Sequence, residues 1–277
     1  MTSPALPSSL HIAFIGGGNM ASAIIGGLLR QGLAASQIDV VEPFAEAAAR
    51  LKSQFGLTAL PEAGPALARA TLVIWAVKPQ AFKEAAQPVQ PHTTQALHLS
   101  VAAGIRTDSI AQWLGSGRIV RAMPNTPALV GQGMTGLFAR PAVSADERAV
   151  VERVIGTTGE SLWVSEESQL DAVTALSGSG PAYVFYFIEG MTEAGVAMGL
   201  AREQAHRLAV ATFVGASALA KASDEAPEVL RQRVTSKGGT TYAAITSMEQ
   251  DGVKAQFKRA LHAAEQRARE LGDEFGK

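Results

Sequence analysis

Two short glycine-rich segments hold the residues of this chain that are best suited to bind a charged ligand. The first, GGGNMA, follows an apolar run at 11–16 and leads into an apolar helical pattern. Its spacing matches GxGxxA on Gly16, Gly18 and Ala21, which permit a tight turn, a close approach of the backbone to a pyrophosphate, and close packing of helix on strand. We therefore predict a dinucleotide-binding loop with a phosphate at the helix N-terminus. A glycine turn before an ordinary packed helix would give the same pattern.

The second segment is TSKGGTT at 235–241. The adjacent Gly238 and Gly239 leave backbone N–H groups free to face a ligand, and Thr240 and Thr241 begin the next helix, whose N-terminus favours an anion. This arrangement predicts a cradle for a carboxylate. The alternative is a helix C-cap at one of the glycines followed by a threonine N-cap.

An acidic residue stands where a dinucleotide-binding fold would use one. The predicted strand 38–41 ends at Glu42, which lies 21 positions after Ala21. An acid near this point can hold a ribose 2′-hydroxyl, and its charge repels a 2′-phosphate. Glu42 therefore favours NADH over NADPH, unless it is only a surface glutamate that follows a strand.

Two further polar residues follow predicted strands. The run LVIWAV at 72–77 is apolar on both faces, as an inner parallel strand is, and Lys78 comes directly after it. Asn125 follows the predicted strand 118–122 at the same edge of the sheet, where ligands of open α/β sheets collect. We predict that Lys78 lies beside a cofactor and that Asn125 lines the nicotinamide side. An ordinary loop would also explain the turn-forming residues at 123–136, the segment that contains Asn125.

These segments require an α/β sheet followed by helices. Strands and helices alternate up to about residue 165 and predict a Rossmann-type domain over 1–165 with a doubly wound sheet. Beyond this point the periodicity is only helical and predicts an all-α domain over 166–277. We expect strands at 11–16, 38–41, 72–77, 97–101, 118–122 and 161–164, a loop at 123–136, and helices at 107–114, 144–156, 169–175, 181–198, 202–222, 227–234, 240–248 and 253–271.

One of these helices, in the stretch 176–200, is apolar on nearly every side. Within it only Glu189, Thr192 and Glu193 form a polar stripe, and Ser179 or Gly180 is a candidate N-cap. A helix of this kind lies at the centre of a helical domain or in a subunit interface. Two glutamates and an SGSGP turn argue against a membrane span. We expect a second subunit to cover it.

The composition limits the other possibilities. With 277 residues, 47% of them hydrophobic and 18% charged, the chain is globular and long enough for two domains. A net charge of −1 disfavours nucleic acid and anionic membranes as partners. The absence of cysteine and the scattering of five histidines exclude thiolate chemistry and disfavour a metal site. The first residues resemble no signal peptide, so we expect a short frayed tail on a cytoplasmic protein.

Five motifs occur in a fixed order along the chain: GGGNMA at 16–21, AVKP at 76–79, MPNTP at 123–127, LSGSGPAY at 176–183 and TSKGGTT at 235–241. Together they resemble pyrroline-5-carboxylate reductases, and the resemblance extends from residue 11 to about residue 271. It implies hydride transfer from NADPH or NADH to the C=N bond of 1-pyrroline-5-carboxylate to give L-proline. It also implies a helical domain of the 6-phosphogluconate dehydrogenase C-terminal type that forms a homodimer, often within a ring such as a decamer.

The resemblance and the residue patterns together give a predicted site without a metal. Thr241 is the predicted catalytic residue, because the resemblance implies that it reaches the ring nitrogen of the substrate. The other substrate positions are Ser179, Ser236, Gly238, Gly239 and Thr240, and the cofactor positions are Gly16, Gly17, Gly18, Asn19, Met20, Glu42, Ala76, Val77, Lys78 and Asn125.

The chain departs from the family at three positions. Lys237 stands where many relatives have proline, Glu42 stands where others often have a small hydroxyl residue, and Ala63 offers no donor where some have an amide. The last two departures put a preference for NADPH in doubt.

Two other functions remain open on the residues alone. A β-hydroxyacid dehydrogenase would need a base such as lysine, but the chain has no lysine between Lys83 and Lys221. A nucleotide-binding sensor would need no carboxylate cradle, so the intact TSKGGTT segment disfavours it.

Overall fold

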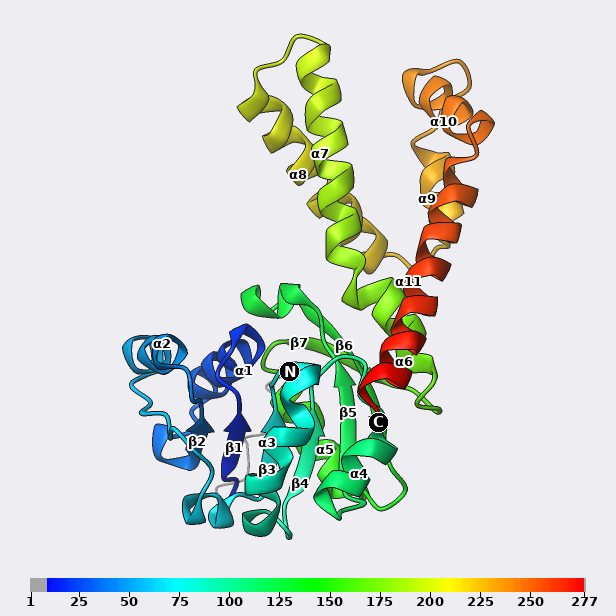
Figure 1. Cartoon of the computed structure of the whole chain (residues 1–277). Helices are drawn as coiled ribbons and strands as arrows, with labels where there is room; N and C mark the ends of the chain where they lie inside the picture. The colour runs from blue at the N-terminus through cyan, green and yellow to red at the C-terminus, as the bar shows by residue number, and fades with distance from the viewer. Residues whose placement is uncertain (1–8, 277) are drawn as a thin grey trace. The chain divides into compact units, whose positions relative to one another are not determined.

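The computed structural model describes residues 9–276 (Figure 1). Its contacts divide the chain into two compact units. Unit 1 comprises the residues up to Gly178 together with those from Ala264 onward, and unit 2 is Ser179–Ala263. Within the described range no helix is long and apolar enough to cross a membrane. The frayed tail that we expected at the start of the chain lies almost wholly outside the described residues.

Unit 1 is built on a seven-stranded sheet with the order β2-β1-β3-β4-β5-β6-β7. Strands β1 to β5 are parallel, β6 runs antiparallel to β5, and β7 runs parallel to β6. The strands are β1 Ile12–Ile15, β2 Ile38–Val41, β3 Leu72–Trp75, β4 Leu97–Ser100, β5 Ile119–Met123, β6 Gly133–Ala139 and β7 Gly159–Trp163.

Both faces of this sheet are buried. Along β1, Ile12 and Phe14 join one apolar cluster, whereas Ala13 and Ile15 join the other, as the two-residue repeat of a strand requires. Helices α1 and α5 contribute to the first cluster, and α3 and α4 to the second. The helices of unit 1 are α1 Asn19–Arg30, α2 Ala45–Phe55, α3 Phe82–Val89, α4 Thr107–Leu114, α5 Ala145–Ile155 and α6 Gln169–Val173. The predicted doubly wound fold is confirmed.

One strand was missed from the sequence. The expected loop at 123–136 overlaps β6, whose glycines imitate turn residues. They are there because neighbours approach closely: a Cβ on Gly133 would lie 2.9 Å from the carbonyl oxygen of Thr158, and one on Gly136 would lie 2.8 Å from Cγ1 of Val173. The six strands that we did predict are present, with ends that differ by at most two residues.

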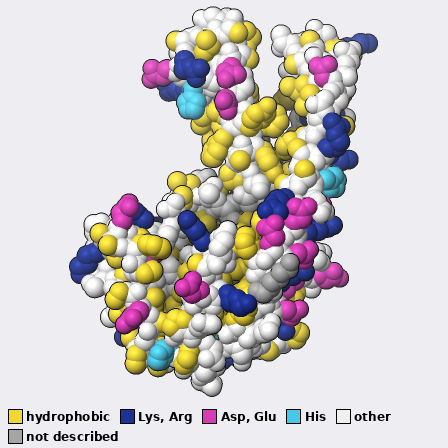
Figure 2. All heavy atoms as spheres, in the orientation of Figure 1, with side chains coloured by type: hydrophobic (Ala, Val, Ile, Leu, Met, Phe, Trp, Pro, Cys, Tyr) yellow, Lys and Arg dark blue, Asp and Glu magenta, His cyan; other side chains and the backbone are white. Residues whose placement is uncertain are grey.

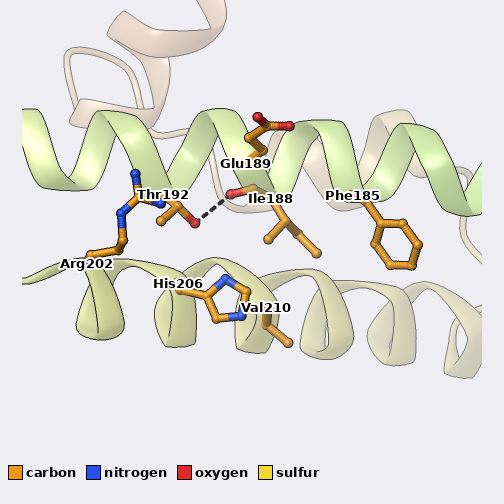
Figure 3. A pocket seen from close by; sticks show the side chains of 7 residues that line it. All are labelled: Phe185, Ile188, Glu189, Thr192, Arg202, His206 and Val210. Atoms are coloured by element: carbon orange, nitrogen blue, oxygen red, sulfur yellow. Dashed lines mark hydrogen bonds between the residues drawn. The ribbon is translucent and has the colours of Figure 1, made fainter.

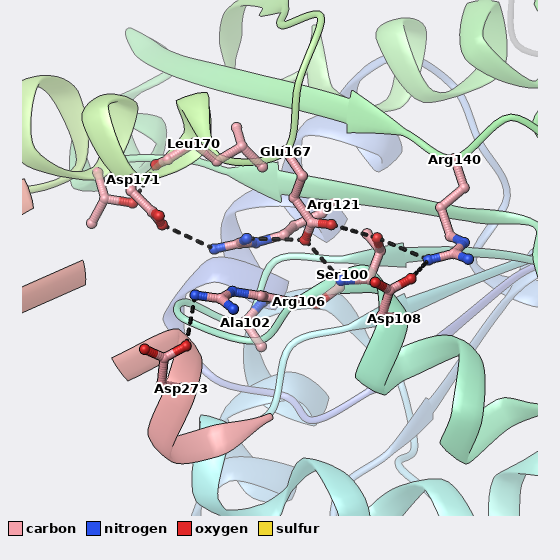
Figure 4. Close-up of polar contacts among 12 residues, drawn as sticks. Ser100, Ala102, Arg106, Asp108, Arg121, Arg140, Glu167, Leu170, Asp171 and Asp273 are labelled. Carbon is pink, nitrogen blue, oxygen red and sulfur yellow. Dashed lines mark hydrogen bonds and ion pairs between the residues drawn. The ribbon is translucent and has the colours of Figure 1, made fainter. Parts of the chain in front are cut away.

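The segment around α6 packs into unit 1 through a buried ion pair (Figure 4). The guanidinium of Arg121, on β5, lies 3.0 Å from the Glu167 carboxylate. That carboxylate also accepts hydrogen bonds from the backbone N–H (2.7 Å) and hydroxyl (2.6 Å) of Thr107. A guanidinium buried in this way needs such a partner. This pair ties the segment that follows β7 to unit 1, which extends to Gly178.

The end of the chain also packs into unit 1. Ser109 of α4 donates a hydrogen bond to the carbonyl oxygen of Gly276 (2.9 Å), and Arg106 pairs with Asp273 at 2.8 Å (Figure 4). A Cβ on Gly104 would lie 3.1 Å from Cβ of Leu271. The predicted domain limits of 1–165 and 166–277 thus differ from the packing units at both ends of the helical region.

Unit 2 is helical throughout, as predicted. Its helices α7 and α8 pack closely, since a Cβ on Gly195 would lie 2.7 Å from Cβ of Ala205. The ring of Phe257, on α11, lies 5.7 Å from that of Tyr183 and 5.8 Å from that of Phe187, both on α7. The helices are α7 Gly180–Ala197, α8 Arg202–Ala222, α9 Pro227–Arg233, α10 Thr240–Gln250 and α11 Val253–Phe275, of which the last part belongs to unit 1.

Much of the apolar surface of helix α7 is exposed. Thr192, from its predicted polar stripe, is only 3% exposed and donates its hydroxyl to the Ile188 carbonyl oxygen, whereas apolar Tyr186 is 73% exposed. Figure 2 shows hydrophobic side chains gathered on the helices of unit 2. The other exposed large apolar residues of α7 are Val184, Phe185, Phe187, Met191 and Val196. A helix packed in a single-chain core buries its apolar side chains and exposes its polar ones, and α7 shows the opposite pattern. Its exposed apolar side chains are available for the predicted subunit interface.

Candidate functional site

The first glycine of the loop between β1 and α1 is required by its neighbours. Gly16 has φ +95, and a Cβ on it would lie 2.7 Å from the carbonyl oxygen of Ala76, which follows β3. Its own N–H donates to the Val41 carbonyl oxygen at 2.9 Å, at the end of β2. The loop therefore lies over the carboxyl ends of the two strands that flank β1.

Glu42 belongs to this loop. The N–H of Gly17 donates to its Oε2 at 2.7 Å, and the N–H of Phe44 donates to its Oε1 at 2.8 Å. The residue is only 6% exposed. A Cβ on Gly17 would lie 2.6 Å from Cδ1 of Leu51, so α2 also presses on the loop. Glu42 is thus fixed beside the glycines and is not a free surface residue.

The N-terminus of α1 fits a pyrophosphate. Gly18 is the N-cap of this helix and provides no side-chain hydrogen bond to it, and a Cβ on Gly18 would meet nothing within 4 Å. Asn19 and Met20 form the first helical positions, so their N–H groups have no acceptor within the helix. Ala21 is fully buried. The open space above uncapped N–H donors is what a dinucleotide phosphate requires.

The segment after β3 is close to the loop. The Ala76 N–H donates to the Ile15 carbonyl oxygen at 2.8 Å, and Cγ1 of Val77 would lie 3.1 Å from a Cβ on Gly16. Lys78 is exposed and precedes a short turn at Pro79–Ala81. Of the three residues predicted here to bind the cofactor, Ala76 and Val77 contact the glycine loop.

Asn125 joins two of the sequence motifs. Its Nδ2 donates to Oγ of Ser177 at 3.2 Å and to the Ser177 carbonyl oxygen at 3.3 Å, and its Oδ1 accepts from the Met134 N–H at 2.9 Å. The amide therefore holds the segment after β5 against the π-helical turn Thr174–Gly178. Ser177 was not among the predicted site residues, although it lies within LSGSGPAY.

The TSKGGTT segment forms a tight turn that opens α10. Gly238 has φ +77, and the Gly239 N–H donates to the Ser236 carbonyl oxygen at 3.0 Å, as in a type II turn. Gly239 is the N-cap, so Thr240 and Thr241 are the first two helical residues. A Cβ on Gly239 would lie 2.8 Å from Oγ of Ser236. The Ser236 hydroxyl and the first N–H groups of α10 are thus close together.

The alternative interpretation of this segment is wrong on both counts. Helix α9 has its C-cap at Val234, before the glycines, and the N-cap of α10 is glycine rather than threonine. Of the two candidate caps of α7, Ser179 and Gly180, Ser179 occupies the N-cap position, but its side chain makes no capping hydrogen bond. The π-helical turn Thr174–Gly178 runs into α7, and the backbone of Ser179 is already helical, so its side chain is not placed to accept from the first turn.

Two hollows of unit 2 lie apart from this turn. A groove of about 520 Å³ lies between α7 and α8 (Figure 3). A second, of about 740 Å³, lies along α11 beside α10. Neither is lined by the residues of the TSKGGTT turn. Within residues 9–276, no group of three or more His, Cys, Asp or Glu side chains could hold a metal ion.

Both halves of the chain match known families. Residues 11–104 match NADP oxidoreductase coenzyme F420-dependent, and residues 167–271 match pyrroline-5-carboxylate reductase dimerisation. With the glycine loop, these matches define an NAD(P)H-dependent oxidoreductase that forms homo-oligomers through a helical domain. Pyrroline-5-carboxylate reductases from Pseudomonas aeruginosa and Haemophilus influenzae are 45% and 41% identical to it, over 97% and 94% of this chain and 99% and 97% of their own. The chain belongs to the pyrroline-5-carboxylate reductase family.

Solved structures agree with this assignment. A pyrroline-5-carboxylate reductase from Coxiella burnetii has a TM-score of 0.89 and 38% identity, and the match covers 95% of this chain and 99% of that one. The Plasmodium falciparum enzyme, which has NADP bound, has a TM-score of 0.84 and 28% identity over 95% of this chain and 98% of its own. The resemblance inferred from the five motifs is confirmed.

Proposed function

We propose a residue-level account of the reaction that this family carries out. The chain transfers a hydride from NAD(P)H to the C=N bond of 1-pyrroline-5-carboxylate and so forms L-proline, the last step of proline synthesis. The observation that carries this account is the turn at 236–239, which brings a serine hydroxyl and uncapped N–H groups to the start of α10. A small carboxylate is a suitable ligand for such a helix N-terminus.

The cofactor is held by unit 1. The N–H groups of Gly18, Asn19 and Met20 bind its pyrophosphate, and the residues at 16–17 and 76–78 surround it together with Glu42 and Asn125. When bound, NAD(P)H supplies the hydride. The internal hydrogen bonds of Asn125 support a positioning role for this residue, since its amide holds two motif segments together.

The substrate is held by unit 2. Ser236, Thr240 and the N–H groups of Gly238 and Gly239 bind its carboxylate, and Thr241 orients its ring nitrogen. Reduction of a C=N bond is easiest when the nitrogen is already protonated, so positioning matters more than a strong catalytic acid. Hydroxyl and backbone N–H groups are sufficient for this task. Ser179, at the start of α7, faces the substrate in this account.

One assay separates this function from its rivals. NADH oxidation with pyrroline-5-carboxylate is compared with NAD reduction by β-hydroxyacids. We expect turnover only with the cyclic imine. Turnover of hydroxyacids alone would identify a dehydrogenase instead, and activity with neither substrate would favour a nucleotide sensor.

The role of Thr241 is tested by substitution. Thr241→Ala should lower kcat/KM by about 100-fold or more, because the group that orients the ring nitrogen is lost. Its Kd for NADH should stay close to that of the wild type. Thr241→Ser keeps the hydroxyl and should recover most of the activity. Wild-type turnover in the alanine variant would remove Thr241 from the catalytic role.

The proposal extends to assembly and location. The homo-oligomer is built from dimers joined through the helices of unit 2, and these dimers form a larger ring such as a decamer. The exposed apolar residues of α7 support such an interface. Light scattering gives the mass directly, and a dimer as the largest species would exclude the ring. We place the enzyme in the cytoplasm, acting on a small-molecule substrate without a nucleic-acid or membrane partner, and fractionation of cells tests this.

A further inference from the structure

The turn after β2 combines a fixed carboxylate and an exposed aromatic ring at the edge of the glycine loop. Both carboxylate oxygens of Glu42 accept backbone N–H groups, one from Gly17 at 2.7 Å and one from Phe44 at 2.8 Å. A carboxylate held by donors on two sides cannot rotate away from a ligand. The carboxylate therefore has a fixed position beside the glycine loop.

No basic side chain offsets this charge from the turn itself. Residues 42–49 read EPFAEAAA and contain neither lysine nor arginine. The next basic residues have other partners: Arg50 pairs with Glu46 at 2.7 Å, Lys52 donates to the Thr58 hydroxyl at 3.0 Å, and Arg69 pairs with Asp39 at 2.6 Å. A 2′-phosphate placed here would face a fixed carboxylate with no cation on the same turn, whereas a 2′-hydroxyl could donate to that carboxylate.

The aromatic ring is that of Phe44. It is 74% exposed, and it is the only exposed aromatic side chain among the described residues of unit 1. The other rings of unit 1 are buried or half-buried. Since the N–H of Phe44 donates to Glu42, the ring and the carboxylate lie on the same short turn. An exposed ring there offers a flat apolar surface on which a base can stack.

We infer that the turn Glu42–Phe44 is a selective adenosine site, in which Glu42 favours NADH over NADPH and Phe44 stacks on the adenine of either cofactor. This inference rests on the proposed role of the glycine loop. It gives Glu42 two tasks, because the same carboxylate also holds the N–H of Gly17. Phe44 only stacks on the adenine, so its contribution to binding does not depend on the 2′-substituent.

The test measures binding rather than turnover. Titration calorimetry gives the Kd of NADH and of NADPH for the full-length enzyme without substrate. Wild type should bind NADH about tenfold more tightly, or more. Glu42→Gln keeps the side-chain size and one acceptor oxygen, and it should lower the NADPH:NADH ratio of Kd values by about tenfold. Phe44→Ala should weaken both cofactors about tenfold and leave the ratio unchanged.

Glu84→Gln is the matched control, because it removes the same charge from an exposed position of unit 1 outside this turn. It should change neither Kd. Tighter binding of NADPH by wild type would overturn the inference. So would a Glu42→Gln variant that loses both cofactors equally and has a lower Tm, since Glu42 would then only support the loop. Failure of wild type to bind either cofactor would also refute the proposed function, whereas equal binding of both would refute this inference alone.

Discussion

The turns that open α1 and α10 are built from the same parts but are supported differently. Each places a glycine at positive φ before a helix whose N-cap is also glycine. The first turn is enclosed, because Gly16 touches Ala76 and the next residue is held by Glu42. Around Gly238, by contrast, a Cβ would meet nothing within 4 Å, and the turn is closed mainly by its own hydrogen bond to Ser236.

We infer from this difference that a single chain can order the turn before α1, whereas the turn before α10 needs a second chain. Unit 1 closes both faces of its sheet and so fixes the cofactor loop before any ligand arrives. Unit 2 leaves much of α7 exposed and supports its ligand turn weakly. We therefore expect cofactor binding to be a property of the single chain, and substrate turnover to depend on the assembly. Four experiments test this contrast between the two units.

The largest effect should come from Gly16→Ala. The new methyl group would collide with the Ala76 carbonyl oxygen at 2.7 Å and would also require φ +95, so the loop must move. We expect the Kd for NADH to rise by about 100-fold or more, which is about 3 kcal/mol. Gly32→Ala is the control, because Gly32 has φ +91 but open space around it. Equal NADH affinity in the two variants would show that the loop is not fixed by its neighbours.

The second effect concerns assembly. Met191→Asp places a charge on the exposed apolar surface of α7, and Phe187→Asp does the same one turn earlier. We expect the dimer to dissociate at micromolar concentration in sedimentation experiments, with loss of turnover but retention of NADH binding. Gln112→Asp, on the surface of unit 1, should leave the oligomer intact. A stable dimer of Met191→Asp would show that α7 is covered in some other way.

The third effect is a pH dependence that belongs to unit 1. Burial, and to a lesser degree the charge of Arg118, lower the pKa of His98 to about 4, and neutral His98 accepts the Trp75 indole N–H at 3.2 Å. The unfolded chain, with a histidine pKa of about 6.5, binds this proton more readily, so stability is lost as pH falls from about 6.5 to about 4.

At pH 5 the loss should be about 2 kcal/mol, visible as a Tm several degrees lower than at pH 7. His98→Asn keeps an acceptor for Trp75, should be less stable at pH 7, and should lose most of this pH dependence. His206→Asn, at an exposed position of unit 2, should keep it. An unchanged slope in His98→Asn would assign the effect to another group.

The smallest effect should come from Lys237→Pro. Lys237 is the second residue of the type II turn, where proline sets φ in advance. Because this turn has few supporting contacts, we expect a gain of about 0.4 to 1 kcal/mol in unfolding free energy and a slightly lower KM for the imine. Lys237→Ala controls for loss of the charge. A destabilised proline variant would mean that the backbone at this position does not fit the turn.

The sequence predicted most of the fold because its buried strands are continuous apolar runs. It also located both glycine turns, since a positive φ at Gly16 and Gly238 leaves few other residues possible. Strand β6 was not predicted, because its glycines serve close packing and resemble turn residues. Local pattern does not reveal which purpose a glycine serves.

Contacts between distant residues were also beyond the sequence. The bond from the Asn125 amide to Ser177, which is 52 positions away, could not be predicted. The extent of unit 1 depends on the pair of Arg121 and Glu167, 46 positions apart. Both partners are ordinary polar residues in their own segments, and only the folded chain brings them together.

The return of the chain to unit 1 has a consequence for how the protein is made. The hydrogen bond between Ser109 and Gly276 joins residues 167 positions apart, and closing so long a loop is slow. The sheet and the glycine loop can form early in synthesis, but the surface beside α4 stays open until residue 276 has left the ribosome. The nucleotide-binding unit is thus begun first and finished last, and the helical unit must be synthesised in between.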